Sequence, residues 1–197
     1  MLSVAIQAGG QSSRMGQEKA LKLFLDRPLI QRVIERLRPI ADELLVTTNH
    51  PADYAFFNLP LFTDLKPGRG PLGGLYTALL CAKHSIVAVA ACDMTFANAE
   101  LFKASSEIMV KEEADVVIAK TNRGYEPLHA VYRRESCISA IEAAIALDKW
   151  RMDSWLSQVK IRLLTPKEID HYDPDGLAFF NINTIEDFAQ AEQRARE

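Results

Sequence analysis

The run Ala8 to Lys19, AGGQSSRMGQEK, brings two adjacent glycines, two hydroxyl side chains and two cations together directly after an apolar stretch. Gly9 and Gly10 allow the backbone to approach an anion closely, while Arg14 and Lys19 supply positive charge. The run matches neither the P-loop nor the dinucleotide-binding pattern, because each requires a residue that is absent here. The two cations favour a phosphate site over an ordinary strand-to-helix loop, since they would stabilise charge that develops on a departing phosphate.

Polar side chains also follow two later apolar runs that read as strands. Asn49 follows the run Glu43 to Thr48, and Asp93 follows the run Ile86 to Ala91. Ligands of open α/β sheets bind beyond the carboxyl ends of the strands, so these residues and the first loop are expected at one rim of the sheet. Turn-forming Asn and Asp also gather at strand ends for structural reasons, and it is the convergence of three strand ends that favours a binding site.

Asp93 is the candidate magnesium ligand, because Mg²⁺ prefers one or two carboxylates together with waters and phosphate oxygens. The alternative is that Asp93 only caps the turn that follows it. Asn181 and Asn183 alternate with Ile182, so in an extended segment both amides would lie on one face and could meet the metal or the phosphates. The same residues would also serve as a polar lead into a helix capped by Thr184.

The elements that must position these residues alternate along the chain. Short runs rich in Val, Ile and Leu predict buried strands of a largely parallel sheet at Leu2 to Ala8, Glu43 to Thr48, Ile86 to Ala91 and Asp115 to Ala119, with further strands at Leu128 to Tyr132 and Val159 to Leu163. Helical spacing predicts helices at Leu29 to Leu37, Leu72 to Ala82, Asn98 to Lys111, Ser136 to Leu147 and Thr184 to Ala195. Pro127 is expected to start its strand or to lie on a sheet edge, because proline cannot donate to a ladder. The alternation predicts an α/β fold with helices on both faces of the sheet.

Length and composition bound the class of protein. The chain has 197 residues, of which 48% are hydrophobic and 25% charged, and no linker or repeat divides it, so we expect a single domain over residues 1–197. With 23 basic and 26 acidic side chains and no long basic run, neither nucleic acid nor an anionic membrane surface is expected as a partner. Three cysteines without Cys-x-x-Cys spacing indicate a reducing compartment, and without a leader or a membrane-length apolar segment we expect a cytoplasmic protein.

The AGGQSSRMGQEK run resembles the signature of GT-A-type nucleotidyltransferases, and most of all that of the molybdenum cofactor guanylyltransferases. The segments FTDLKPGRGPLGGL, ACDM, EPLHAVY and FFNINTIEDF resemble that family too, in its order along the chain. The resemblance implies a three-layer, Rossmann-like α/β/α fold with a mostly parallel sheet and an antiparallel strand. It also implies transfer of GMP from GTP to the terminal phosphate of molybdenum-molybdopterin, with Mg²⁺ as cofactor.

The resemblance also implies roles for individual residues. Arg14, Lys19 and Asp93 would be catalytic, and Asp93, with Asn181 as a second candidate, would hold the metal. The nucleotide would be bound by Gln7, Ala8, Gly9, Gly10, Lys19, Asn49, Asp64 and Asp93. The molybdopterin would be bound by His129, Asn181 and Asn183, with Arg133 as a phosphate contact. Molybdenum-insertion proteins and apo-molybdoenzymes are the partners that such a product would imply.

The chain departs from that family at Gln7, where Leu is common, and at Thr95, where Pro is usual. If backbone groups grip the base, Gln7 matters little, whereas a side chain that packs on guanine would alter nucleotide preference. Two other functions therefore stay open. One is a CTP-dependent cytidylyltransferase that acts on molybdopterin or on a sugar or alcohol phosphate, and the other is a nucleotide-binding module without catalysis.

Overall fold

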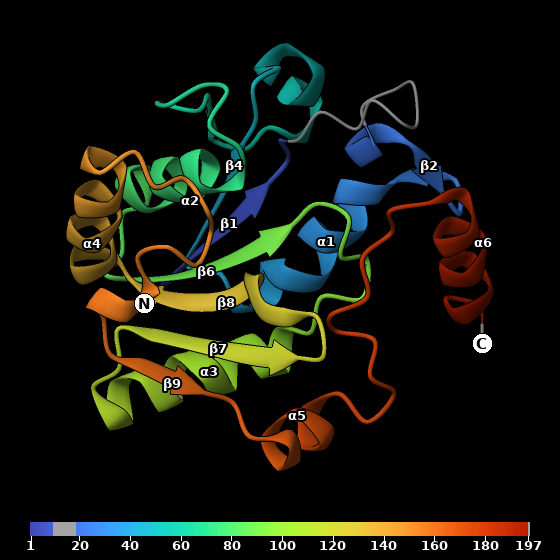
Figure 1. Ribbon diagram of the computed structural model, residues 1–197. Helices are drawn as coiled ribbons and strands as arrows, with labels where there is room; N and C mark the ends of the chain where they lie inside the picture. The colour runs from blue at the N-terminus through green and yellow to red at the C-terminus, as the bar shows by residue number, and fades with distance from the viewer. Residues whose placement is uncertain (10–18, 197) are drawn as a thin grey trace.

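The computed structural model describes residues 1–9 and 19–196. The described strands form a seven-stranded sheet in the order β5-β4-β1-β6-β8-β7-β9 and a separate two-stranded hairpin, β2-β3 (Figure 1). The strands are β1 Leu2–Gln7, β2 Leu23–Phe24, β3 Arg27–Pro28, β4 Glu43–Thr47, β5 Leu61–Phe62, β6 Ile86–Ala91, β7 Val116–Thr121, β8 Gly124–Arg133 and β9 Ile161–Leu163. The α-helices are α1 Leu29–Leu37, α2 Pro71–Cys81, α3 Ala99–Glu112, α4 Arg134–Ala146, α5 Pro166–Tyr172 and α6 Ile185–Arg194. Short 3₁₀ turns are η1 Lys19–Leu21, η2 Arg38–Ile40, η3 Pro51–Phe57 and η4 Leu156–Gln158.

The sheet is parallel apart from β8, which pairs antiparallel with both β6 and β7. This confirms the expected mostly parallel sheet with an antiparallel strand. The reversal has a direct consequence for the site, because the first residues of β8 lie at the same edge as the last residues of β1 and β6. The chain therefore enters β8 where the neighbouring strands end.

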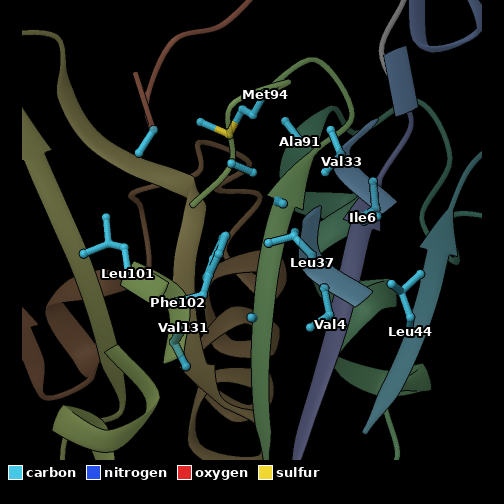
Figure 2. Packing of buried hydrophobic residues seen from close by; sticks show 14 of the residues in the cluster. Val4, Ile6, Val33, Leu37, Leu44, Ala91, Met94, Leu101, Phe102 and Val131 are labelled. Atoms are coloured by element: carbon cyan, nitrogen blue, oxygen red, sulfur yellow. The ribbon is translucent and has the colours of Figure 1, made fainter. Parts of the chain in front are cut away.

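Helices cover both faces of the sheet, as the alternating pattern predicts. Alternate residues of β1 face opposite ways, so that Val4 and Ile6 pack against α1 on one face while Ala5 joins the cluster beneath α2 and α4 on the other. Figure 2 shows the first of these cores, in which Val33 and Leu37 of α1 lie beside β1. Burial of both faces explains why the strands are continuously apolar.

Side chains cap the first turns of two helices. The Asn98 side chain accepts a hydrogen bond from the Leu101 N–H at 3.0 Å and so caps α3. Thr184 and Asp187 form a complete capping box at the start of α6. Pro28 directly precedes α1.

One prediction about the sheet is wrong. Pro127 lies inside β8, which starts at Gly124 and is a central strand. The proline fits there because the β7–β8 register shifts between Ile118 and Lys120, so a bulge interrupts the ladder where its missing N–H would be needed. No pattern in the sequence predicted the short strand β5, the β2–β3 hairpin or α5.

No helix within residues 1–9 and 19–196 is both long enough and apolar enough to cross a bilayer.

Candidate active site

A cavity of about 280 Å³ opens at the edge of the sheet where β1 and β6 end and β8 begins. Asp93 follows β6 and occupies the middle of this edge, since β6 lies between β1 and β8. The cavity is lined by Gln7, Gly9, Pro71, Ala91, Cys92, Asp93, Met94, Glu126, Pro127, Leu128, Asn181 and Asn183. Two of the predicted strand ends, those followed by Gly9 and Asp93, therefore meet at this cavity, which extends to the beginning of the antiparallel strand.

Lys19, the first residue of η1, reaches across this edge to Asp93. Its Nζ donates to Asp93 Oδ2 at 2.6 Å and to Asn183 Oδ1 at 3.0 Å. The Lys19 and Asp93 side chains are only 12% and 18% exposed, so their ion pair is shielded from solvent far more than a surface pair. Three residues that are distant in sequence thus form one charged group at the cavity.

The segment around Ile182 is anchored to the same turn. The Ile182 N–H donates to the Asp93 carbonyl oxygen at 3.3 Å, and the Ile182 side chain is fully buried in a small core beside α6. Asn181 and Asn183 both line the cavity, which is the alternation that the sequence predicts. Asn181 Oδ1 is buried and accepts no hydrogen bond from any described residue, so a strong acceptor is left available there.

Gln7 is held between β1 and the start of α2. Its Nε2 donates to the Pro71 carbonyl oxygen at 2.9 Å, and its side chain is packed so closely against Gly74 that a Cβ at that position would lie 2.3 Å from Nε2. Gln7 Oε1 is buried without a hydrogen-bond donor among the described residues. The backbone continues the sheet on both sides, since the Ala8 N–H donates to Thr47 and the Cys92 N–H donates to Gln7.

Asn49 and Asp64 form a separate pair beyond the ends of β4 and β5. The Asn49 Nδ2 group donates to Asp64 Oδ2 at 3.2 Å, and the Asp64 N–H donates back to Asn49 Oδ1 at 3.3 Å. Burial raises the pKa of the Asp64 carboxyl above its usual range, and the hydrogen bond from Asn49 acts in the opposite direction. Both residues lie at the expected rim, although neither lines the cavity.

The structure does not bring His129 to the cavity. The imidazole is 2% exposed, stacks on Phe102 at 4.0 Å between ring centroids, and accepts a hydrogen bond from the Asn98 N–H at Nε2. Burial lowers the pKa of His129 to about 4, so the ring is neutral at pH 7. This residue packs β8 against α3.

Arg133 is found at the wrong edge of the sheet for a phosphate contact. It pairs with Ile86, the first residue of β6, and its Nε donates to the Ala114 carbonyl oxygen at 3.1 Å. Because β8 is antiparallel to β6, its last residue lies far from Asp93. The predicted phosphate contact is therefore wrong.

Two predicted residues, Gly10 and Arg14, lie outside the described residues.

Glu126 is a cavity residue that the sequence analysis missed. It is 7% exposed, and its Oε1 accepts from Thr121 Oγ1 at 2.7 Å and from Arg123 Nη2 at 3.1 Å. The available signal was an acidic residue placed directly before Pro127 in the otherwise apolar EPLHAVY segment.

The oxygen atoms at the cavity suit a hard divalent cation. Asp93 supplies one carboxylate, Asn181 supplies the unpartnered amide oxygen and Asn183 supplies another amide oxygen. No cluster of three or more His, Cys, Asp or Glu side chains that could enclose a metal occurs within the described ranges. A site with one carboxylate and room for phosphate oxygens is the kind that Mg²⁺ uses.

Comparison with known proteins identifies the family. Residues 4–161 match the model of the MobA-like NTP transferase domain. The chain belongs to this family. A probable molybdenum cofactor guanylyltransferase of Carboxydothermus hydrogenoformans is 37% identical to this MobA-like transferase over 95% of the chain and 93% of the relative. One of Peptoclostridium acidaminophilum is 34% identical over 99% of the chain and 90% of the relative.

Solved structures resemble the MobA-like transferase over its whole length. Molybdopterin-guanine dinucleotide biosynthesis protein A from Archaeoglobus fulgidus superposes with a TM-score of 0.85 at 25% identity and covers 98% of each chain. A 4-diphosphocytidyl-2C-methyl-D-erythritol synthase from Anaerococcus prevotii has a TM-score of 0.70 at 11% identity, covering 100% of this chain and 98% of its own. The second likeness shows that the fold is shared with a more distant nucleotidyltransferase.

Proposed function

We propose that this protein transfers GMP from GTP to the terminal phosphate of molybdenum-molybdopterin, giving the guanine dinucleotide form of the cofactor and pyrophosphate. The observation that carries the proposal is the shielded contact of Lys19 with Asp93 and Asn183 at a cavity where β1 and β6 end and β8 begins. Relatives that match nearly the full chain and are called molybdenum cofactor guanylyltransferases support the choice of substrates.

In the proposed reaction, an oxygen of the acceptor phosphate attacks the α-phosphorus of GTP, and the bond from that phosphorus to the bridging oxygen of pyrophosphate breaks. The acceptor needs no general base, because a phosphate monoester is already largely dianionic at pH 7. The task of the protein is therefore to hold two anions together and to stabilise charge on the leaving pyrophosphate. The Lys19 ammonium group, buried beside the cavity, is the described residue that supplies this charge.

Asp93 and Asn181 are the residues that would hold Mg²⁺. When bound, the cation would neutralise part of the negative charge of the triphosphate. Asn183 keeps Lys19 directed at Asp93 through its hydrogen bond. We further propose that the reaction takes place in the cytoplasm and that molybdenum-insertion proteins and apo-molybdoenzymes receive the product.

The test is pyrophosphate release with GTP, CTP and ATP in turn, each with and without molybdenum-loaded molybdopterin. Release with GTP that depends on the acceptor is expected. A preference for CTP would support the cytidylyltransferase instead. GTP binding without magnesium-dependent pyrophosphate release would identify a binding module.

Lys19→Ala and Asp93→Ala should each lower turnover by on the order of 100-fold or more, because each removes a preorganised charge at the reacting phosphates. Steady-state pyrophosphate release measures the loss, and thermal unfolding checks that both variants fold. Lys167→Ala and Asp175→Ala remove charges from exposed positions and serve as matched controls. Near-normal turnover in either Lys19→Ala or Asp93→Ala would refute the assignment of the site.

A further inference from the structure

Glu126 is a buried carboxylate at the cavity that the proposed transfer of GMP does not use. It lies near the start of β8, and the order β1-β6-β8 puts it on the other side of Asp93 from Gln7 and Gly9. Burying a carboxylate is costly unless hydrogen bonds compensate for the lost water. The arrangement of its two oxygens therefore indicates what the residue is for.

Only one of the two oxygens is engaged within the protein. Oε1 accepts both hydrogen bonds, from Thr121 Oγ1 and from Arg123 Nη2, whereas Oε2 accepts none from the residues that the structure describes. Arg123 also donates to the Phe179 carbonyl oxygen at 2.6 Å, which ties Glu126 to the segment that carries Asn181 and Asn183. The structural role of Glu126 is thus fulfilled through Oε1, and Oε2 keeps its capacity to accept.

The neighbours of Glu126 suit the face of a flat ring. Pro127 and Leu128 follow it in β8 and line the same cavity, and Met94 lines the cavity from the turn after β6. An acceptor-only carboxylate oxygen at the edge of an apolar surface selects a ring whose edge carries N–H donors. It disfavours a ring that presents only carbonyl oxygens at that edge.

We infer that Glu126 recognises the pterin ring of the acceptor by accepting hydrogen bonds from its 2-amino-4-oxo edge. This inference rests on the proposed function, in which the acceptor is a pterin. The ring carries its 2-amino group and N3–H side by side, and both are donors. Guanine has a similar edge, but the resemblance implies that Gln7 and Gly9 bind the nucleotide, and these residues line the opposite side of Asp93, which leaves the Glu126 side to the acceptor.

Glu126→Gln is the decisive variant. The amide oxygen can still accept from Thr121 and Arg123, while an NH₂ group replaces Oε2 and opposes the donors of the pterin. We expect KM for molybdenum-molybdopterin to rise about tenfold or more, which is typical of losing a hydrogen bond to a charged group. KM for GTP should stay within about twofold of the wild-type value, the usual range for a change outside the nucleotide site.

Asp173→Asn provides the matched control. Asp173 is equally buried, at 7% exposure, but its two oxygens accept from the Leu177 and Ala178 N–H groups and it does not line the cavity. This variant should lower the melting temperature and leave KM for the acceptor unchanged. An unchanged KM for molybdopterin in Glu126→Gln, or a rise in KM for GTP instead, would overturn the inference.

A binding experiment tests Glu126 without turnover. 6-Hydroxymethylpterin and 6-hydroxymethyllumazine, which has oxygen in place of the 2-amino group, are titrated by their fluorescence into the wild-type protein and Glu126→Gln. The wild type should prefer the pterin, and the variant should lose that preference. No preference in the wild type would also overturn the inference. Absence of acceptor-dependent pyrophosphate release by the wild type would overturn the proposed function, which this titration does not measure.

Discussion

His129 shows how burial makes a single residue sensitive to pH. Its pKa of about 4 in the folded protein lies below the usual 6.5, so between these values the unfolded chain binds a proton that the folded chain does not. The free energy of unfolding should therefore decrease as pH falls from about 6.5 and level off below about 4. From pH 7 to pH 5 the contribution of His129 is about 2 kcal/mol.

His129→Phe tests this prediction, because phenylalanine can keep the stack on Phe102 but cannot take up a proton. The loss of the acceptor for the Asn98 N–H lowers stability by an amount that does not depend on pH. Denaturant unfolding at pH 7 and pH 5 should thus give a smaller loss on acidification for the variant than for the wild type. Equal losses would show that His129 is not the responsible group.

Residue types predicted the charged part of the site better than the recognition part. The sequence predicted Asp93 at a strand end and both asparagines on one face of an extended segment, and in the structure Lys19 donates to Asp93 and to Asn183. Glu126 escaped prediction because its burial depends on Thr121 and Arg123, which approach it only through the β7–β8 turn. These partners are only five and three residues away along the chain, but they meet Glu126 because β7 and β8 extend to a tight turn, beyond the strands predicted at Asp115 to Ala119 and Leu128 to Tyr132.

The packing of β1 on α2 depends on the absence of a side chain at Gly74. Gly74→Ala would put a methyl group 2.3 Å from Gln7 Nε2 and displace the amide from its hydrogen bond with Pro71. We expect a loss of about 1–3 kcal/mol of stability, as for other overpacked sites. In a Gln7→Ala background the same change should cost less than about 0.5 kcal/mol, because the clashing atoms are gone.

Gly73→Ala is the control in the same turn of α2. A Cβ at Gly73 would lie 2.9 Å from the Lys66 carbonyl oxygen, which Gln7→Ala does not remove. Denaturant unfolding of the single and double variants measures both couplings. If Gln7→Ala reduced the stability cost of Gly74→Ala and of Gly73→Ala by the same amount, the close contact between Gln7 and position 74 would be contradicted.

Long apolar elements were predicted to within a few residues, and irregular ones were not. α2 was expected at Leu72 to Ala82 and spans Pro71–Cys81, because its apolar run continues over about three helical turns, too long for a strand. α5 and β5 are too short to show a period, and their positions are fixed by tertiary contacts. Pro127 was misjudged because the bulge that accommodates it depends on how β7 pairs.

At the scale of the whole molecule, the two main cores share one sheet and should unfold together. Val4 and Ile6 of β1 belong to one core and Ala5 belongs to the other. Disordering β1 would therefore disrupt both cores at once. Denaturant unfolding should give a single transition with the same midpoint by circular dichroism at 222 nm and by fluorescence of the fully buried Trp155. Trp150→Phe leaves Trp155 as the sole tryptophan probe. Separate midpoints would instead indicate two independently folding units.

Because β8 comes after β6 in the chain and lies on the other side of it from β1, the two sides of the cavity are separated along the sequence. Gln7, Gly9 and Pro71 come before Asp93, and Glu126 and the two asparagines come after it. Substitutions in the later part of the chain can therefore reshape one side while the other keeps its sequence. If Glu126 recognises the acceptor as we propose, a protein with this topology could evolve a new acceptor through changes near the start of β8, and an engineer could alter acceptor specificity separately from the Gln7 side.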